Sequence, residues 1–122
     1  MSFKVFLSYA IKDAAIAELV KAKITELLPL SNVEPADVFD VRFELAAGED
    51  IRQSIKSAIE AANTVVVISS ESSDSSAWVN YEVGLADALG KELVVVEQKG
   101  SADSAIHRRL FESARIVKIE NG

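Results

Sequence analysis

Two unbroken apolar runs most strongly limit what this chain can fold into. Residues 65–68 read Val-Val-Val-Ile and residues 93–96 read Leu-Val-Val-Val, with no polar residue in either. Strands of this kind are covered on both faces, which is typical of the centre of a parallel sheet between two layers of helices. Other short segments rich in branched and aromatic residues complete a prediction of five strands, at residues 3–8, 37–41, 64–69, 92–97 and 115–119.

Segments with apolar residues at helical spacing lie between these strands and predict helices at residues 13–28, 51–62, 76–90 and 102–113. Asp13 is a candidate N-cap, Asp50 and Gln53 have the spacing of a capping box, and Gly90 fits the position just after a helix. The alternation predicts one domain, residues 1–122. We expect the α/β class, as a flavodoxin-like doubly wound sheet of five parallel strands in the order 2-1-3-4-5.

Composition and charge exclude several classes of function. The formal net charge of −6 argues against a nucleic-acid partner. The chain has no cysteine, and its one histidine, His107, lies beside two arginines on a helix expected to face solvent, so we expect no metal site and no catalytic triad. No segment resembles a signal peptide or a membrane span, which predicts a cytoplasmic protein with no membrane partner.

Glu82 is the residue that the predicted core does not explain. It lies four residues after Trp78, so the two share one face of the third helix, and Leu85, Ala86 and Leu89 continue that face. Burying an unpaired charge is costly, so such a carboxylate finds a partner, changes its protonation or has a function. A structural and a functional interpretation of Glu82 are both open at this point.

The expected topology places this carboxylate at the ligand crevice. With the strand order 2-1-3-4-5, the crevice lies beyond the carboxyl ends of the first and third strands. Ser8, Tyr9 and Ala10 follow the first of these, and Ser69 follows the other. The turn at residues 8–13 has no glycine, which excludes a glycine-rich phosphate loop, and a serine at position 69 excludes a phosphoacceptor aspartate.

In order along the chain, these segments resemble the Toll/interleukin-1 receptor (TIR) domain, in particular its bacterial members. Residues 5–9, followed by Asp13, resemble the first box of the family, and residues 38–40 with 45–51 resemble its second strand and BB loop. Residues 65–69 resemble its third strand, and residues 76–82 its tryptophan-to-glutamate helix. In catalytic members this glutamate is essential for cleaving NAD⁺ between nicotinamide and ribose, so the resemblance assigns that role to Glu82.

The resemblance implies further site residues. NAD⁺ is then the substrate rather than a bound cofactor, and the products are nicotinamide and linear or cyclic ADP-ribose, in signalling or defence. Substrate contacts are expected from Ser8, Tyr9, Ala10, Phe43, Ser69 and Trp78. Self-association with other TIR domains is expected through a BB-like loop that includes Phe43, Leu45, Gly48, Glu49 and Asp50. One carboxylate suffices for this chemistry, because nicotinamide leaves as a neutral molecule and the developing ribosyl cation needs a nearby negative charge.

Two other functions stay open. Residues 82–91 also resemble the nucleoside 2-deoxyribosyltransferases, in which a glutamate on a similar helix is the nucleophile, although Trp78 and the BB-like loop argue against this. The other alternative is a non-catalytic scaffold that acts only by homotypic association. Ala10 and Ile11 follow Tyr9, where TIR domains often have basic residues, which places phosphate contacts in question. Trp78 can equally be core packing, and Ser8 a backbone cap.

Overall fold

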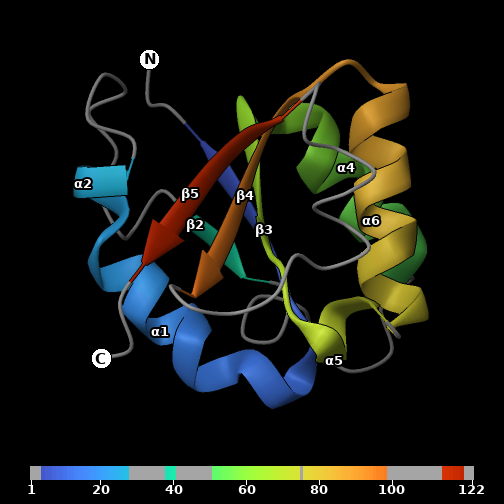
Figure 1. Ribbon diagram of the computed structural model, residues 1–122. Helices are drawn as coiled ribbons and strands as arrows, with labels where there is room; N and C mark the ends of the chain where they lie inside the picture. Colours follow the sequence, from blue (N-terminus) through green and yellow to red (C-terminus); the bar gives the residue numbers. More distant parts are fainter. Residues whose placement is uncertain (1–3, 28–37, 41–50, 75, 99–113, 120–122) are drawn as a thin grey trace.

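The computed structural model of the chain describes residues 4–27, 38–40, 51–74, 76–98 and 114–119 (Figure 1). Five strands form one parallel sheet in the order β2-β1-β3-β4-β5. The strands are β1 (Val5–Ser8), β2 (Val38–Asp40), β3 (Thr64–Ile68), β4 (Glu92–Gln98) and β5 (Arg115–Ile119). The predicted fold class and strand order are therefore confirmed, and β1 lies between β2 and β3, where the order reverses.

The helices lie on both sides of this sheet, with α1 and α2 on one side and α4 and α6 on the other (Figure 1). They are the 3-10 helix η1 (Ile11–Asp13) and the α-helices α1 (Ala14–Ala22), α2 (Ile24–Leu27), α4 (Ile51–Ala61), α5 (Glu71–Asp74) and α6 (Ala77–Ala88). Within the described part of the chain, no helix has the length and apolar character needed to cross a membrane.

Two predictions about helices were wrong. The helix expected at residues 13–28 is divided at Lys23, whose backbone N–H is shared between the carbonyls of Leu19 and Val20, each 3.1 Å away. The segment between the predicted strand at residues 64–69 and the predicted helix at 76–90, for which no helix was expected, contains the short helix α5. The fourth predicted helix, at residues 102–113, lies outside the described residues, as does the BB-like loop.

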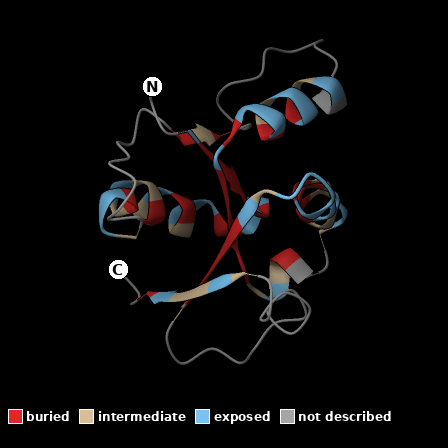
Figure 2. Ribbon diagram, turned by 90° about the horizontal axis from the view of Figure 1, so that it is seen from above, coloured by how far each residue is buried: buried red, intermediate tan, exposed pale blue. Residues whose placement is uncertain are grey.

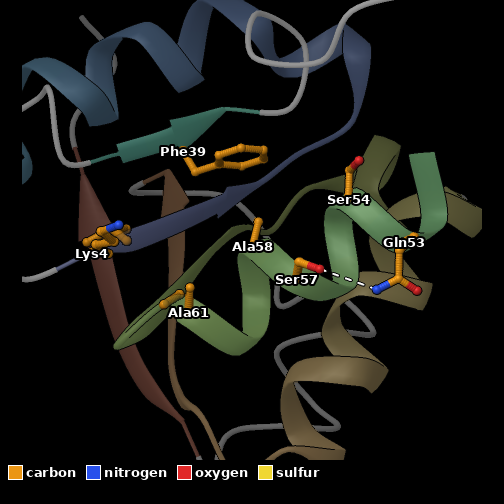
Figure 3. A pocket seen from close by; sticks show the side chains of 9 residues that line it. Lys4, Phe39, Gln53, Ser54, Ser57, Ala58 and Ala61 are labelled. Carbon is orange, nitrogen blue, oxygen red and sulfur yellow. Dashed lines mark hydrogen bonds between the residues drawn. The ribbon is translucent and has the colours of Figure 1, made fainter. Parts of the chain in front are cut away.

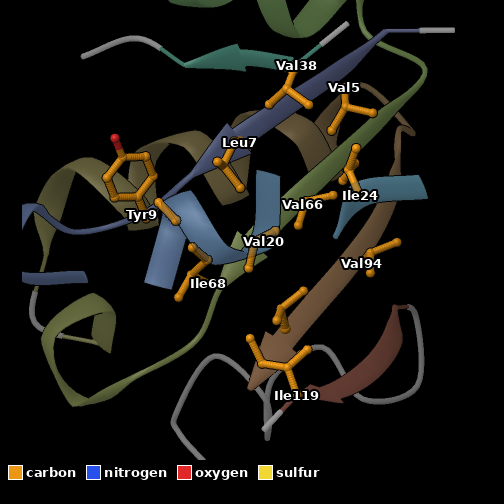
Figure 4. Close-up of a cluster of buried hydrophobic side chains, with 12 residues drawn as sticks. Val5, Leu7, Tyr9, Val20, Ile24, Val38, Val66, Ile68, Val94 and Ile119 are labelled. Atoms are coloured by element: carbon orange, nitrogen blue, oxygen red, sulfur yellow. The ribbon is translucent and has the colours of Figure 1, made fainter. Parts of the chain in front are cut away.

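Alternation along β1 divides the core into two halves, one on each face of the sheet. Val5, Leu7 and Tyr9 belong to what we call the α1-side core, which also holds Ala17, Val20, Ile24, Val66, Ile68, Val94 and Val96 (Figure 4). Phe6 and Ala10 belong to the α6-side core, with Ile55, Ile59, Val65, Val67, Val79, Val83, Ala86 and Val95. The apolar runs in β3 and β4 contribute to both, and Figure 2 shows the buried residues concentrated along these central strands.

The ends of α6 match the sequence prediction. Ser76 is the N-cap, and its hydroxyl accepts a hydrogen bond from the Val79 N–H at 3.2 Å. Gly90 has φ +68°, the left-handed conformation that favours glycine after a helix. The N-cap prediction for Asp13 is corrected: it precedes α1, but its side chain makes no capping hydrogen bond and is used elsewhere.

Candidate functional site

The candidate site is centred on a contact between β1 and α6. The Ser8 hydroxyl donates a hydrogen bond to Oε1 of Glu82 at 2.7 Å, and each residue is 1% exposed. Ser8 faces α6 because it alternates with Leu7 and Tyr9, which face α1. The contact joins residues 74 positions apart in the sequence and lies at the carboxyl end of β1, where the strand order reverses.

Glu82 lies in a strongly apolar setting. The buried face of α6 consists of Val79, Glu82, Val83 and Ala86, so the carboxylate occupies a position where an aliphatic side chain would serve packing better. The predicted stripe is corrected in one respect, because Leu89 is 39% exposed and does not belong to the buried face. A buried carboxylate of this kind is a candidate functional group, and its catalytic role stays a prediction.

Trp78 borders the same face of α6. Its ring is half-buried, packs against the α6-side core and lies 6.4 Å from the ring of Tyr81. Its indole Nε1 is buried and donates to no acceptor among the described residues. The ring of Trp78 therefore serves packing, and its contact with a substrate stays a prediction.

Tyr9 lies on the other face of the sheet from Glu82 (Figure 4). Its hydroxyl is 2.9 Å from both carboxylate oxygens of Asp40, at the end of β2, and its side chain is 3% exposed. Direct contact between Tyr9 and a substrate stays a prediction. What the structure provides is a hydrogen bond that fixes the end of β2 against β1.

Lys21 completes this network from α1. Its ammonium group lies 3.4 Å from Asp40 and 3.3 Å from Glu18. Burial lowers the pKa of Lys21, but the hydrogen bonds and negative charges of Glu18 and Asp40 outweigh this effect and raise that pKa above its ordinary value of 10.5. Lys21 is therefore a permanent cation beside the buried Asp40.

A second hydrogen-bond cluster joins the segments that follow β1 and β3. The Ser70 hydroxyl donates to Oδ2 of the buried Asp13 at 2.5 Å and accepts from the Ser73 N–H at 3.0 Å. The Ser70 N–H donates in turn to the Ser73 hydroxyl at 2.7 Å. Sequence reasoning missed this connection, because Asp13 and Ser70 are 57 positions apart and no helix was predicted just after the third strand.

The remaining predicted site residues lie as follows. Ala10 is buried in the α6-side core, and the next residue, Ile11, is 71% exposed. Ser69 is buried, and its N–H donates to the Val96 carbonyl at 2.8 Å. The residues expected to form the BB-like loop are outside the described part of the chain, namely Phe43, Leu45, Gly48, Glu49 and Asp50.

A further buried carboxylate that was not predicted lies in β4. Glu97, near the end of β4, is 2% exposed and forms an ion pair with Lys118 of β5, at 3.4 Å. The two residues are direct neighbours in the sheet register, which explains the pair. In the described residues, no three His, Cys, Asp or Glu side chains gather in an arrangement that could hold a metal ion.

The fold and site define a doubly wound α/β domain with a carboxylate buried where its strand order reverses. The sequence pattern of the TIR domain family matches residues 5–118, so the chain belongs to that family. A search of curated protein sequences finds no match.

Solved structures with the same fold include two described as TIR domains. The TIR domain of the Toll-related receptor TRR-2 from Hydra magnipapillata has a TM-score of 0.67 and 14% identity, covering 96% of this chain and 84% of that one. The TIR domains of the activated Roq1 resistosome, which recognises the pathogen effector XopQ, have a TM-score of 0.61 and 23% identity, covering 82% of this chain and 60% of that one.

A third similar structure is the CMP N-glycosidase BcmB from Clostridium botulinum. It has a TM-score of 0.58 and 18% identity, over 97% of this chain and 88% of the glycosidase. At these identities the likeness concerns the fold.

Proposed function

We propose that this TIR domain is an NAD⁺ glycohydrolase that cleaves the bond between nicotinamide and ribose, with Glu82 as its catalytic residue. The observation that carries the proposal is the Ser8–Glu82 contact, a buried carboxylate held by a buried hydroxyl at the switch point of the sheet. The TIR family match supports the choice of NAD⁺ as substrate.

The proposed reaction needs few protein groups. The bond between C1′ of the ribose and the nicotinamide nitrogen breaks, and nicotinamide keeps the electron pair and leaves neutral. Glu82 stabilises the ribosyl cation or orients the ribose hydroxyls. In hydrolysis, water adds to C1′ and one proton is released, while attack by an adenine nitrogen of the same molecule would give the cyclic product. Ser8 orients the carboxylate, and Trp78 offers its indole N–H and ring to the substrate.

The test is an NAD⁺ turnover assay at high protein concentration, with separation of nicotinamide, ADP-ribose and cyclic ADP-ribose. We expect Glu82→Gln to abolish nicotinamide release while keeping the fold, because the amide has nearly the same shape and still accepts from Ser8. Asp87→Asn is the matched control, since it removes an exposed carboxylate from the same helix. Turnover at the wild-type rate by folded Glu82→Gln protein would refute the assignment.

A second candidate function is a nucleotide N-glycosidase. The likeness to a CMP N-glycosidase across nearly the whole chain favours it. CMP hydrolysis also breaks a bond between a ribose C1′ and a ring nitrogen, so the same carboxylate could serve. Cytosine release from CMP, in the absence of nicotinamide release from NAD⁺, would favour this candidate.

Two further outcomes have their own readouts. Base exchange with deoxynucleosides would point to the deoxyribosyltransferase alternative. A lack of turnover with every substrate, at every protein concentration, would favour the non-catalytic scaffold.

We infer that the partners are NAD⁺ and other TIR domains in homotypic assemblies, acting in the cytoplasm in signalling or defence. The family match and the resistosome likeness support the second partner.

A further inference from the structure

A cavity of about 470 Å³ lies between α4 and the two strands β1 and β2 (Figure 3). Small-molecule sites have volumes of about 300 to 1,000 Å³. Its walls include Lys4 at the amino end of β1, Phe39 of β2, and Ser57, Ala58 and Ala61 of α4. It shares no residue with the Ser8–Glu82 contact, which lies at the opposite end of β1.

The sequence of α4 makes this space. Two neighbouring stripes run along the helix: the isoleucines at 55 and 59 are fully buried against the sheet, while the second stripe has only small side chains. That second stripe consists of Ser54, Ser57, Ala58 and Ala61, at helical spacing, and it lines the cavity. Larger side chains at these positions would reach β2 and fill the space. The cavity therefore exists because this stripe of α4 has only small side chains.

Phe39 supplies an aromatic wall. Its ring stacks on the fully buried Phe6, with ring centroids 5.6 Å apart and an interplanar angle of 18°. In Figure 3 the Phe39 ring projects from β2 toward α4, with Ala58 on the other side of the cavity. An aromatic ring in the wall of a cavity suits a planar ligand, which can add an offset-stacked partner.

The polar groups of the cavity are few and separated. Gln53 and Ser57 are joined by a hydrogen bond of 3.3 Å at the rim and are both exposed, so either can turn to a ligand. Lys4 is the one charged residue among those that line the cavity, and within the described part of the chain no carboxylate is paired with its ammonium group. A lysine with no carboxylate partner among the described residues attracts an anionic group on a ligand, and it does so locally, against the net charge of −6 on the chain.

We propose that this cavity is a binding site for a small planar aromatic molecule that carries one anionic group, such as an aromatic carboxylate or sulfonate. The ring lies between Phe39 and the alanines of α4, and the anionic group lies at Lys4. Gln53 and Ser57 receive a polar substituent. The proposal is independent of the NAD⁺ chemistry, because none of its residues belongs to the Glu82 site.

The test uses two fluorescent probes with the same ring system. Anilinonaphthalene sulfonate is the anion, and phenylnaphthylamine is its neutral counterpart. We expect wild-type protein to bind the anion saturably at one site. Ala61→Leu should weaken both probes about tenfold or more, because the added side chain fills the cavity. Ala88→Leu is the matched control: each alanine is exposed and is the last residue of its helix, but Ala88 is outside the cavity.

Charge is tested separately. Lys4→Gln should weaken the anion about threefold and leave the neutral probe unchanged, while Lys56→Gln, at an exposed lysine of α4 that does not line the cavity, should change neither. Thermal melts exclude a loss of folding in any variant. Equal probe affinity in the two leucine variants, or no saturable binding by the wild type, would overturn the site. An equal response of both probes to Lys4→Gln would overturn the anionic part.

Discussion

At the scale of single residues, the position of Ser8 makes a sharp prediction. Ser8→Ala removes the donor that holds Glu82 Oε1 and leaves a buried acceptor less satisfied. Such losses cost about 1 to 3 kcal/mol. We expect that decrease in the free energy of unfolding, together with a lower kcat for nicotinamide release at nearly unchanged KM, because the carboxylate loses its orientation and the substrate keeps its other contacts.

A double-mutant cycle provides the control for Ser8. Combining Ser8→Ala with Glu82→Ala should cost less stability than the sum of the two single variants, because each of them removes the Ser8–Glu82 hydrogen bond. Additive effects, measured by denaturant unfolding, would mean that the two side chains do not act as a pair.

Tyr9 should behave as a structural residue. Tyr9→Phe removes a hydrogen bond to a buried carboxylate, so we expect a loss of about 1.5 to 3 kcal/mol in the free energy of unfolding, with turnover unchanged at a temperature where the variant is folded. Tyr81→Phe, at a 39% exposed tyrosine, should stay within about 0.5 kcal/mol of wild type. Lower turnover with full stability in Tyr9→Phe would instead support the predicted substrate contact.

The sequence was enough to single out Glu82 and Ser8 as candidate site residues, but it did not predict the hydrogen bonds that join distant segments of the chain. Glu82 was visible because a carboxylate interrupts an apolar stripe, and Ser8 because it ends a strand at the expected switch point. Neither the Tyr9–Asp40 contact nor the Asp13–Ser70 contact was predicted, because their partners are 31 and 57 positions apart and belong to different elements. Periodicity shows which face a side chain occupies, and it does not show which polar group it meets there.

At the scale of elements, the strands were predicted to within two residues, while short helices were not. The strands of the centre are fixed by burial on both faces, which leaves a strong apolar signature. Helix α5 is only four residues long and has no apolar stripe, and the division between α1 and α2 depends on one shared backbone hydrogen bond at Lys23. Features of that size leave no periodic pattern in the sequence.

The connection between Asp13 and Ser70 should hold two elements together. Ser70→Ala removes the donor to a buried carboxylate and the acceptor of the Ser73 N–H, so we expect a loss of about 1 to 3 kcal/mol in the free energy of unfolding. Hydrogen exchange should rise in η1 and α5 together, because each holds the other. Ser57→Ala, at an exposed serine of α4, should stay within about 0.5 kcal/mol. Faster exchange in α5 alone would contradict the coupling.

At the scale of the whole molecule, two properties bear on how the domain would be activated. Glu82 is 1% exposed, so a substrate cannot touch its carboxylate unless the surrounding segments move. The net charge of −6 makes copies of the domain repel one another at low ionic strength. Both properties predict that the domain has little activity at low protein concentration.

The last prediction is that activity depends on self-association through the BB-like loop at residues 43–50. In TIR domains the corresponding loop packs on a neighbouring copy and helps to complete the NAD⁺ site, so association here should provide the movement that exposes Glu82. Specific activity should then rise with protein concentration, and with moderate added salt that screens the repulsion. Leu45→Glu or Gly48→Glu should lower activity without unfolding. Lys56→Gln, at an exposed position of α4, makes the same change in net charge and should not. Constant specific activity over a wide dilution series, with a monomeric profile throughout, would rule this mechanism out.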